Sequence, residues 1–152
     1  MANVNHSTLT DPYLHEPKGV YAAAANKVYV SDGSNSGAWT ALGLVISGTI
    51  DDVSTAATVY VPIPFAGTIS KVVSVLDGAI SHANATVTVK NSSAASMGTL
   101  TITQSGSAAG DVDTLSPSSN NTVSANSFIT VATDGASNTA RKLNFVVTLD
   151  RS

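Results

Sequence analysis

The clearest strand signal in this chain is the stretch LNFVVTLD at residues 143–150. Side chains of a β-strand point alternately to opposite faces, whereas a helix would need apolar residues three or four positions apart. The alternation therefore predicts a half-buried strand that closes a sheet, with its apolar face made of Leu143, Phe145, Val147 and Leu149.

Shorter alternating runs precede this stretch from Leu42 onward. Val87 and Val89 alternate with polar residues, and Leu100 and Ile102 do the same. Antiparallel strands with one buried and one solvated face show this pattern. We therefore expect two further half-buried strands in this region.

Residues 59–65 predict a strand at the edge of a sheet. Proline cannot donate a ladder hydrogen bond, and this run contains Pro62 and Pro64. The alternation places both prolines and Tyr60 on one face, and it places on the other face Val59, Val61, Ile63 and Phe65. The strand pattern then continues toward the Asp77-Gly78 dipeptide through Ile69, Val73 and Val75.

The turns and the number of strands indicate the fold class. Asp77-Gly78 and Asp134-Gly135 are turn dipeptides in which glycine can adopt a positive φ. About eight strands follow residue 42, and no stretch has the 3.6-residue period of a helix. We predict an all-β, antiparallel β-sandwich with jelly-roll topology; an immunoglobulin-like topology is the alternative.

Composition excludes several classes of partner. Of the 152 residues, 43% are hydrophobic and only 11% are charged, against about 25% charged in ordinary soluble proteins. The net charge is −3 and the lysines and arginines are scattered, so we expect no nucleic-acid partner. No apolar run is long enough to span a bilayer, so we expect no membrane partner. With no cysteine, the chain has no disulfide framework.

Residues 1–40 differ from the rest and predict an N-terminal arm ahead of a sandwich domain at residues 41–152. Prolines punctuate the arm at Asp11-Pro12 and Glu16-Pro17, and its one plausible hairpin strand is Lys27-Val28-Tyr29-Val30. An isolated hairpin is marginally stable in water. The arm therefore needs a partner surface, which could belong to its own domain, to sibling subunits or to another protein.

Catalytic and metal-binding chemistry is poorly supported. The three histidines are His6 and His15 in the arm and His82 in a predicted loop, and none has a nucleophile pattern beside it. The pairs Asp51-Asp52 and Asp111-Asp113 could offer oxygen ligands to Ca²⁺, but no calcium-loop motif surrounds them. We expect no enzyme activity, no catalytic residue, no metal site and no cofactor.

Several motifs resemble the head-decoration and head-fibre proteins of tailed phages. In the arm they are Leu14-His15-Glu16-Pro17-Lys18-Gly19-Val20, Ala22 to Asn26, Val28-Tyr29-Val30-Ser31-Asp32-Gly33 and Ser36-Gly37-Ala38-Trp39-Thr40. In the domain they are Ile46 to Ser54 and Gly106 to Asp113. Related leader segments also occur in tail-fibre proteins.

The resemblance implies a non-enzymatic decoration (cement) subunit that forms a homotrimer on the outer capsid surface of the virion. Its partners would be the major capsid protein and further copies of itself. Capsid-binding residues are predicted in the arm, among its apolar and aromatic groups: Tyr13, Leu14, His15, Pro17, Tyr21, Tyr29 and Trp39. A receptor- or glycan-binding adhesin of a tail or head fibre is the alternative; it would carry an exposed groove or an aromatic platform.

Overall fold

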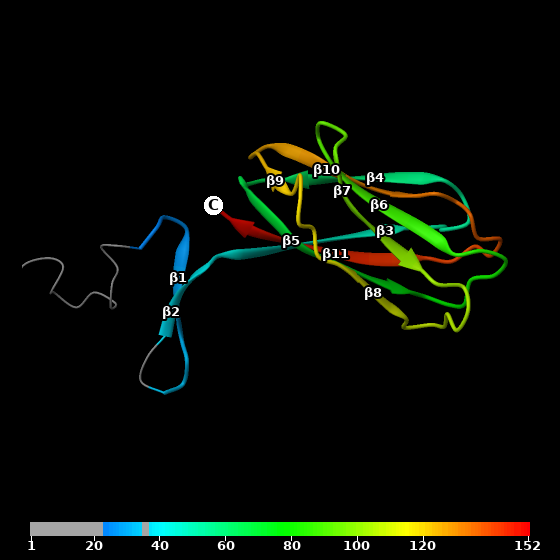
Figure 1. The fold of residues 1–152 in the computed structure, drawn as a ribbon, viewed down its shortest axis with the longest axis horizontal. Helices are drawn as coiled ribbons and strands as arrows, with labels where there is room; N and C mark the ends of the chain where they lie inside the picture. The colour runs from blue at the N-terminus through cyan, green and yellow to red at the C-terminus, as the bar shows by residue number, and fades with distance from the viewer. Residues whose placement is uncertain (1–22, 35–36) are drawn as a thin grey trace, which may run out of the picture. The chain divides into compact units, whose positions relative to one another are not determined.

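A computed structural model describes residues 23–34 and 37–152 of the chain (Figure 1). The described residues fall into two units, divided between Leu42 and Gly43. In the described residues no helix is long and apolar enough to cross a membrane.

The described part of the first unit is a β-hairpin. Strands β1 (Lys27–Ser31) and β2 (Gly37–Ala41) pair antiparallel, with Tyr29 directly opposite Trp39. Asp32 and Gly33 begin the connection, where Asp32 Oδ1 accepts a hydrogen bond from the N–H of Ser34 at 2.7 Å. At the other end, the N–H of Leu42 donates to the carbonyl of Asn26 at 3.1 Å. The expected hairpin is present.

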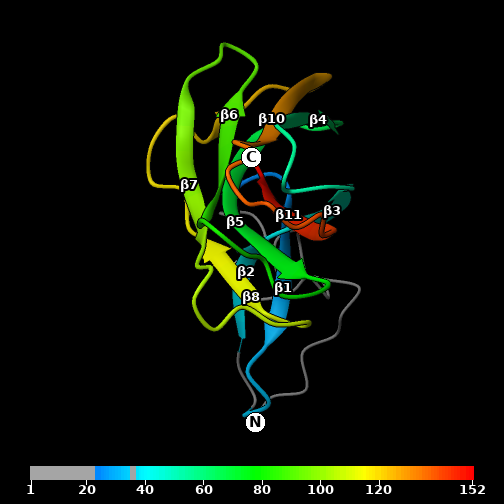
Figure 2. The ribbon, with the colours of Figure 1, turned by 90° about the vertical axis from the view of Figure 1, so that its right-hand side faces the viewer.

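The second unit is a sandwich of two antiparallel sheets, which Figures 1 and 2 show as stacked layers. One sheet has the strand order β3-β11-β5-β8, and the short β9 also pairs with β5; the other sheet has the order β4-β10-β6-β7. The strands are β3 (Gly43–Ile50), β4 (Ala57–Ile63), β5 (Gly67–Leu76), β6 (Ala85–Asn91), β7 (Ser96–Ile102), β8 (Val112–Leu115), β9 (Thr122–Val123), β10 (Ser127–Thr133) and β11 (Leu143–Arg151).

The strand order is that of a jelly roll. Leaving the short β9 aside, the first strand of the sandwich pairs with the last, β3 with β11, and the second with the second-last, β4 with β10. The pairs β5–β8 and β6–β7 complete the series. A long hairpin wrapped into two sheets gives this order. The all-β, jelly-roll prediction is confirmed, and the immunoglobulin-like alternative is wrong.

The core lies between the two sheets and consists of aliphatic side chains and one phenylalanine. The predicted inward residues of β11 are all buried, and so are Val87, Val89, Leu100 and Ile102. The expectation that residues 143–150 close a sheet is wrong, because β11 pairs with β3 on one side and with β5 on the other. β11 is therefore an interior strand of its sheet.

Strand β4 confirms the edge prediction, since it pairs with β10 alone among the described strands. Val61 and Ile63 are buried as expected, whereas Phe65 lies beyond the strand and is 40% exposed. The Phe65 ring instead contacts the guanidinium of Arg151, whose Cζ is 4.2 Å from the ring centroid.

A β-bulge changes the orientation of residues in β5. In its pairing with β11, Lys71 lies opposite Thr148 and Ile69 opposite Leu149, so that Ser70 is the extra residue. Ile69 is therefore buried, but the residues facing inward after the bulge are Val72, Ser74 and Leu76. Val73 and Val75 lie on the outer face of the sheet.

The two predicted turn glycines behave differently. Gly135 has φ +72°, as expected of a turn that follows Asp134. Gly78 is absent from the residues with positive φ, so that expectation is wrong. A Cβ at Gly78 would lie 2.8 Å from the guanidinium of Arg141, the flexible end of that side chain, which would have to shift. Arg141 Nε donates to the carbonyl of Ala79 at 3.0 Å.

Candidate functional site

Of the predicted capsid-binding residues, Tyr29 and Trp39 lie within the described residues. Tyr13, Leu14, His15, Pro17 and Tyr21 lie outside them. Tyr29 and Trp39 are brought together by the register of the hairpin, and their ring centroids are 5.4 Å apart with an interplanar angle of 64°. Edge-to-face contacts of this kind stabilise a cross-strand pair. Both rings are half-buried, so each also presents surface to solvent.

The opposite face of the hairpin is apolar as well. Val28 and Val30 alternate with Tyr29 along β1 and are 39% and 50% exposed. They lie two residues apart, so they point to the same side. The hairpin therefore has an aromatic face and an aliphatic face.

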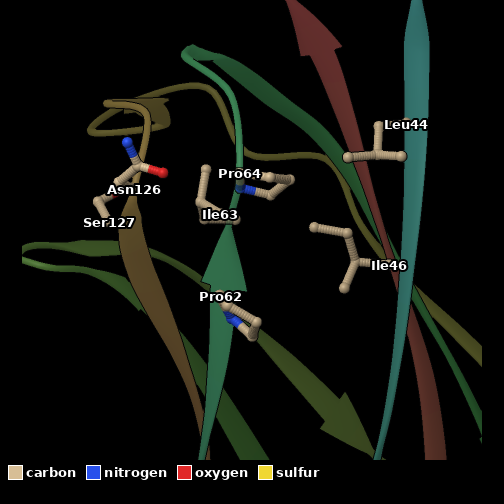
Figure 3. Close-up of a pocket in the computed structure, with 7 residues that line it drawn as sticks. All are labelled: Leu44, Ile46, Pro62, Ile63, Pro64, Asn126 and Ser127. Atoms are coloured by element: carbon tan, nitrogen blue, oxygen red, sulfur yellow. The ribbon is translucent and has the colours of Figure 1, made fainter.

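The sandwich carries an apolar groove of about 570 Å³ between the edge strands β3 and β4 (Figure 3). Leu44 and Ile46 project from β3 toward Pro62 to Pro64, at the end of β4 and just beyond it. Asn126 and Ser127, at the start of β10, complete the lining. We call this depression the β3–β4 groove.

The sequence explains why the groove stays open. Leu44 and Ile46 face inward from β3 and pack against the core, yet they remain half-buried because they lie near the margin of the sandwich. Pro62 and Pro64 have no N–H to donate, so they cannot help another strand to pair there and cover the margin. The sequence predicted the edge strand but not the groove, because it does not show that the consecutive strands β3 and β4 lie at the edges of different sheets.

An aromatic pair lies on the outer face of the second sheet. Tyr60 on β4 and Phe128 on β10 have ring centroids 5.4 Å apart at an interplanar angle of 59°. Tyr60 is 67% exposed and Phe128 is 39% exposed. Sequence reasoning placed Tyr60 on the same face as Pro62 and Pro64 but missed Phe128. The missed signal was an aromatic residue at an outward position of SFITVAT, residues 127–133.

The aspartates Asp51 and Asp52 lie in the turn that follows β3. Asp52 Oδ1 accepts hydrogen bonds from the hydroxyl of Ser54 at 2.6 Å and from its N–H at 2.8 Å, which hold the pKa of Asp52 below its usual value. Asp51 is exposed and lies 3.6 Å from Lys142 Nζ. In the part of the chain that the structure describes, no three histidine or acidic side chains gather as a metal site would require.

The pKa of Asp113 is shifted in the opposite direction from that of Asp52. It lies on β8 opposite the buried Ser74, and burial together with the nearby charge of Asp111 raises its pKa. Asp134 is also partly desolvated, which by itself would raise its pKa. Hydrogen bonds from the N–H groups of Thr86 and Ala136, each 3.1 Å long, outweigh that effect and lower the pKa of Asp134.

Comparison with known proteins adds little. Neither a family model nor a curated protein sequence matches the chain. A solved structure similar to it is the "Cyanophage Pam1 capsid asymmetric unit", with a TM-score of 0.49 and a sequence identity of 16%. The similarity covers 74% of this chain and 87% of that chain. A likeness of this degree says nothing about function.

Proposed function

We propose that this chain is a non-enzymatic structural protein of a phage virion, which binds the outer capsid surface as a decoration subunit and stabilises the shell. The proposal rests on the arm, whose motifs at residues 14–40 resemble the leaders of head-decoration proteins. The hairpin in this arm supports it, because β1 and β2 carry half-exposed side chains on both faces and have no core of their own.

A decoration subunit would stabilise the shell by mass action. A ligand that binds the assembled shell more tightly than the loosened shell shifts the equilibrium toward the assembled form. A chain with only 11% charged residues suits this task, because few of its contacts can depend on ionic strength. The major capsid protein is the proposed partner, and a homotrimer is the proposed state.

The direct test is co-sedimentation of the purified chain with capsids that lack it. We expect the chain to pellet with the capsids and to raise their disruption temperature. Trp39→Ala should weaken the attachment by about 1–3 kcal/mol if the indole is an interface anchor. Tyr60→Ala is the matched control, since it removes an exposed aromatic ring from the sandwich instead of the arm. Failure of the wild-type chain to pellet would contradict the proposal.

A second candidate function is supported by the exposed pair Tyr60 and Phe128. Sugars stack on aromatic faces, and threonine hydroxyls at Thr58 and Thr130 on the same strands offer hydrogen bonds. Such a platform fits a glycan-binding adhesin. A glycan array with wild type and Tyr60→Ala separates the two functions, because a decoration subunit needs no glycan signal and an adhesin should lose its signal in the variant.

A further inference from the structure

The free edge of β3 is unusual among the strand edges of the sandwich. β3 runs for eight residues, GLVISGTI, and among the described strands it pairs with β11 alone. It contains no charged residue and no proline, and its register with β11 is continuous. A long, uncharged edge is a template for pairing with another chain.

The other three edges carry features that hinder pairing. β4 contains Pro62, and β7 has an irregularity at Met97, the residue skipped in its register with β6. β8 has only four residues and contains Asp113. Prolines, bulges, short strands and charges are the means by which proteins protect sheet edges. β3 carries none of them, so its edge is able to accept another strand.

We propose that strand β1 of a second copy of this chain pairs with the free edge of β3 and extends its sheet. Val28 and Val30 of that copy then enter the β3–β4 groove beside Leu44 and Ile46. The inference supplies a contact for the proposed homotrimer but does not depend on the proposed capsid binding, because it concerns contacts between copies and not contacts with a capsid.

The chemistry of the two surfaces matches. The groove is lined by aliphatic and proline carbons and holds about 570 Å³, which is room for the side chains of two valines. Val28 and Val30 are exposed on one face of β1 at the two-residue spacing of a strand. Strand addition supplies backbone hydrogen bonds for affinity and leaves alternate side chains to fill pockets.

The length of the connection indicates a second copy as the source of the strand. β1 pairs with β2 over all five of its residues, and only Leu42 separates β2 from β3. If β1 of the same chain lay beside β3, β2 would lie on the far side of β1, about 10 Å from β3. The step from Ala41 to Gly43 spans at most about 7 Å, so one chain cannot make this connection. An isolated two-stranded hairpin is only marginally stable and gains a sheet by this pairing.

The contact is heterologous, since a hairpin on one copy meets a sandwich edge on the next. Heterologous contacts produce closed rings when the rotation between copies closes. A ring of three copies would satisfy every hairpin and every β3 edge, and it agrees with the homotrimer of the proposed function.

The test uses the full-length chain and a matched pair of variants, followed by light scattering after size-exclusion chromatography. Val30→Lys places an ammonium group where the groove would bury it, whereas Val112→Lys makes the same change at a valine of similar exposure on β8, 55% against 50%. We expect trimers for wild type and for Val112→Lys. For Val30→Lys we expect the dissociation constant to rise at least about tenfold.

Cysteine pairs give an independent readout, because the natural chain contains no cysteine. The double variant Val30→Cys/Ile46→Cys should form covalent multimers under oxidising conditions, and reduction should dissolve them. Val30→Cys/Val112→Cys is the control and should form no such ladder. A monomeric wild type, or a Val30→Lys variant that assembles as tightly as wild type, would overturn the inference whether or not the chain binds capsids.

Discussion

Gly48 on β3 lies opposite Phe145 on β11 and faces the core. The phenyl ring of Phe145 occupies the space that a side chain at position 48 would need. An aromatic ring over a glycine in the neighbouring strand is a cross-strand pair that stabilises a sheet. The lack of a side chain at Gly48 therefore makes room for Phe145, the largest fully buried side chain among the described residues.

We predict that Gly48→Ala destabilises the protein by about 1–3 kcal/mol, because the added methyl group displaces Phe145 from a packed core. Thermal unfolding followed by circular dichroism measures the change. Ser47→Ala, on the exposed face of the same strand, is the control and should leave the melting temperature nearly unchanged. Equal melting temperatures for Gly48→Ala and wild type would show that the core has room for the methyl group.

Asp113 predicts a pH-dependent stability change with a defined sign. Its folded-state pKa is raised above the unfolded value, so the folded chain holds the proton more tightly and loses that stability as pH rises through the raised pKa. At pH 7 the partly buried carboxylate is therefore unfavourable. Asp113→Asn should raise the melting temperature at pH 7.

The gain from Asp113→Asn should vanish below the unfolded pKa of 3.8, where the carboxyl is protonated in both states. A pH series of melting curves tests this. Asp51→Asn alters an exposed carboxylate whose lysine partner is 59% exposed, so it should change stability by less than about 1 kcal/mol. A gain from Asp113→Asn that stays constant down to pH 3 would exclude ionisation as its cause.

At the level of elements, alternation predicted the strands whose two faces differ most. Residues 143–150, with leucine or phenylalanine at three of the four inward positions, left no ambiguity about the face that is buried. Alternation failed in β5, because one extra residue at Ser70 exchanges the two faces and leaves no mark in the polarity of the sequence. The β3–β4 groove was missed for a different reason, since it depends on which strand edges become neighbours.

Hydrogen exchange should rank the strands by their position in the sheets. Amides of β11 and β10 pair with strands on both sides, so we expect them to exchange only by global unfolding. Amides of the β1–β2 hairpin should exchange much faster in a variant that cannot assemble, such as Val30→Lys. Mass spectrometry measures the exchange. A hairpin as protected as β11 would contradict this order.

At the scale of the molecule, the sequence motifs and the fold concern different parts of the chain. The alternating strands that predicted a sandwich lie after residue 42, whereas the motifs that suggested a function lie mostly before it. Two of the predicted capsid-binding residues, Tyr29 and Trp39, lie in the hairpin. No sequence pattern showed that their rings pack on each other. The exposed Phe128 was missed although alternation in its strand places it on the face opposite the buried Ile129 and Val131.

The last prediction concerns a cut between Leu42 and Gly43, where the two compact units meet in the chain. Every buried hydrophobic residue of the described chain lies between Ile50 and Leu149, so a fragment of residues 43–152 retains the whole core. We expect this fragment to be β-rich and to melt cooperatively. It should also be monomeric, because it lacks β1, and it should fail to pellet with undecorated capsids.

These readouts separate the roles of the two units. A fragment that unfolds without a cooperative transition would mean that residues 1–42 contribute to the stability of the sandwich. If the fragment folds and still decorates capsids at full occupancy, the capsid-binding surface lies on the sandwich itself. Its exposed outer valines, Val45, Val75 and Val112, would then be the first residues to replace, since they form apolar surface on the sheet that contains β3 and β8.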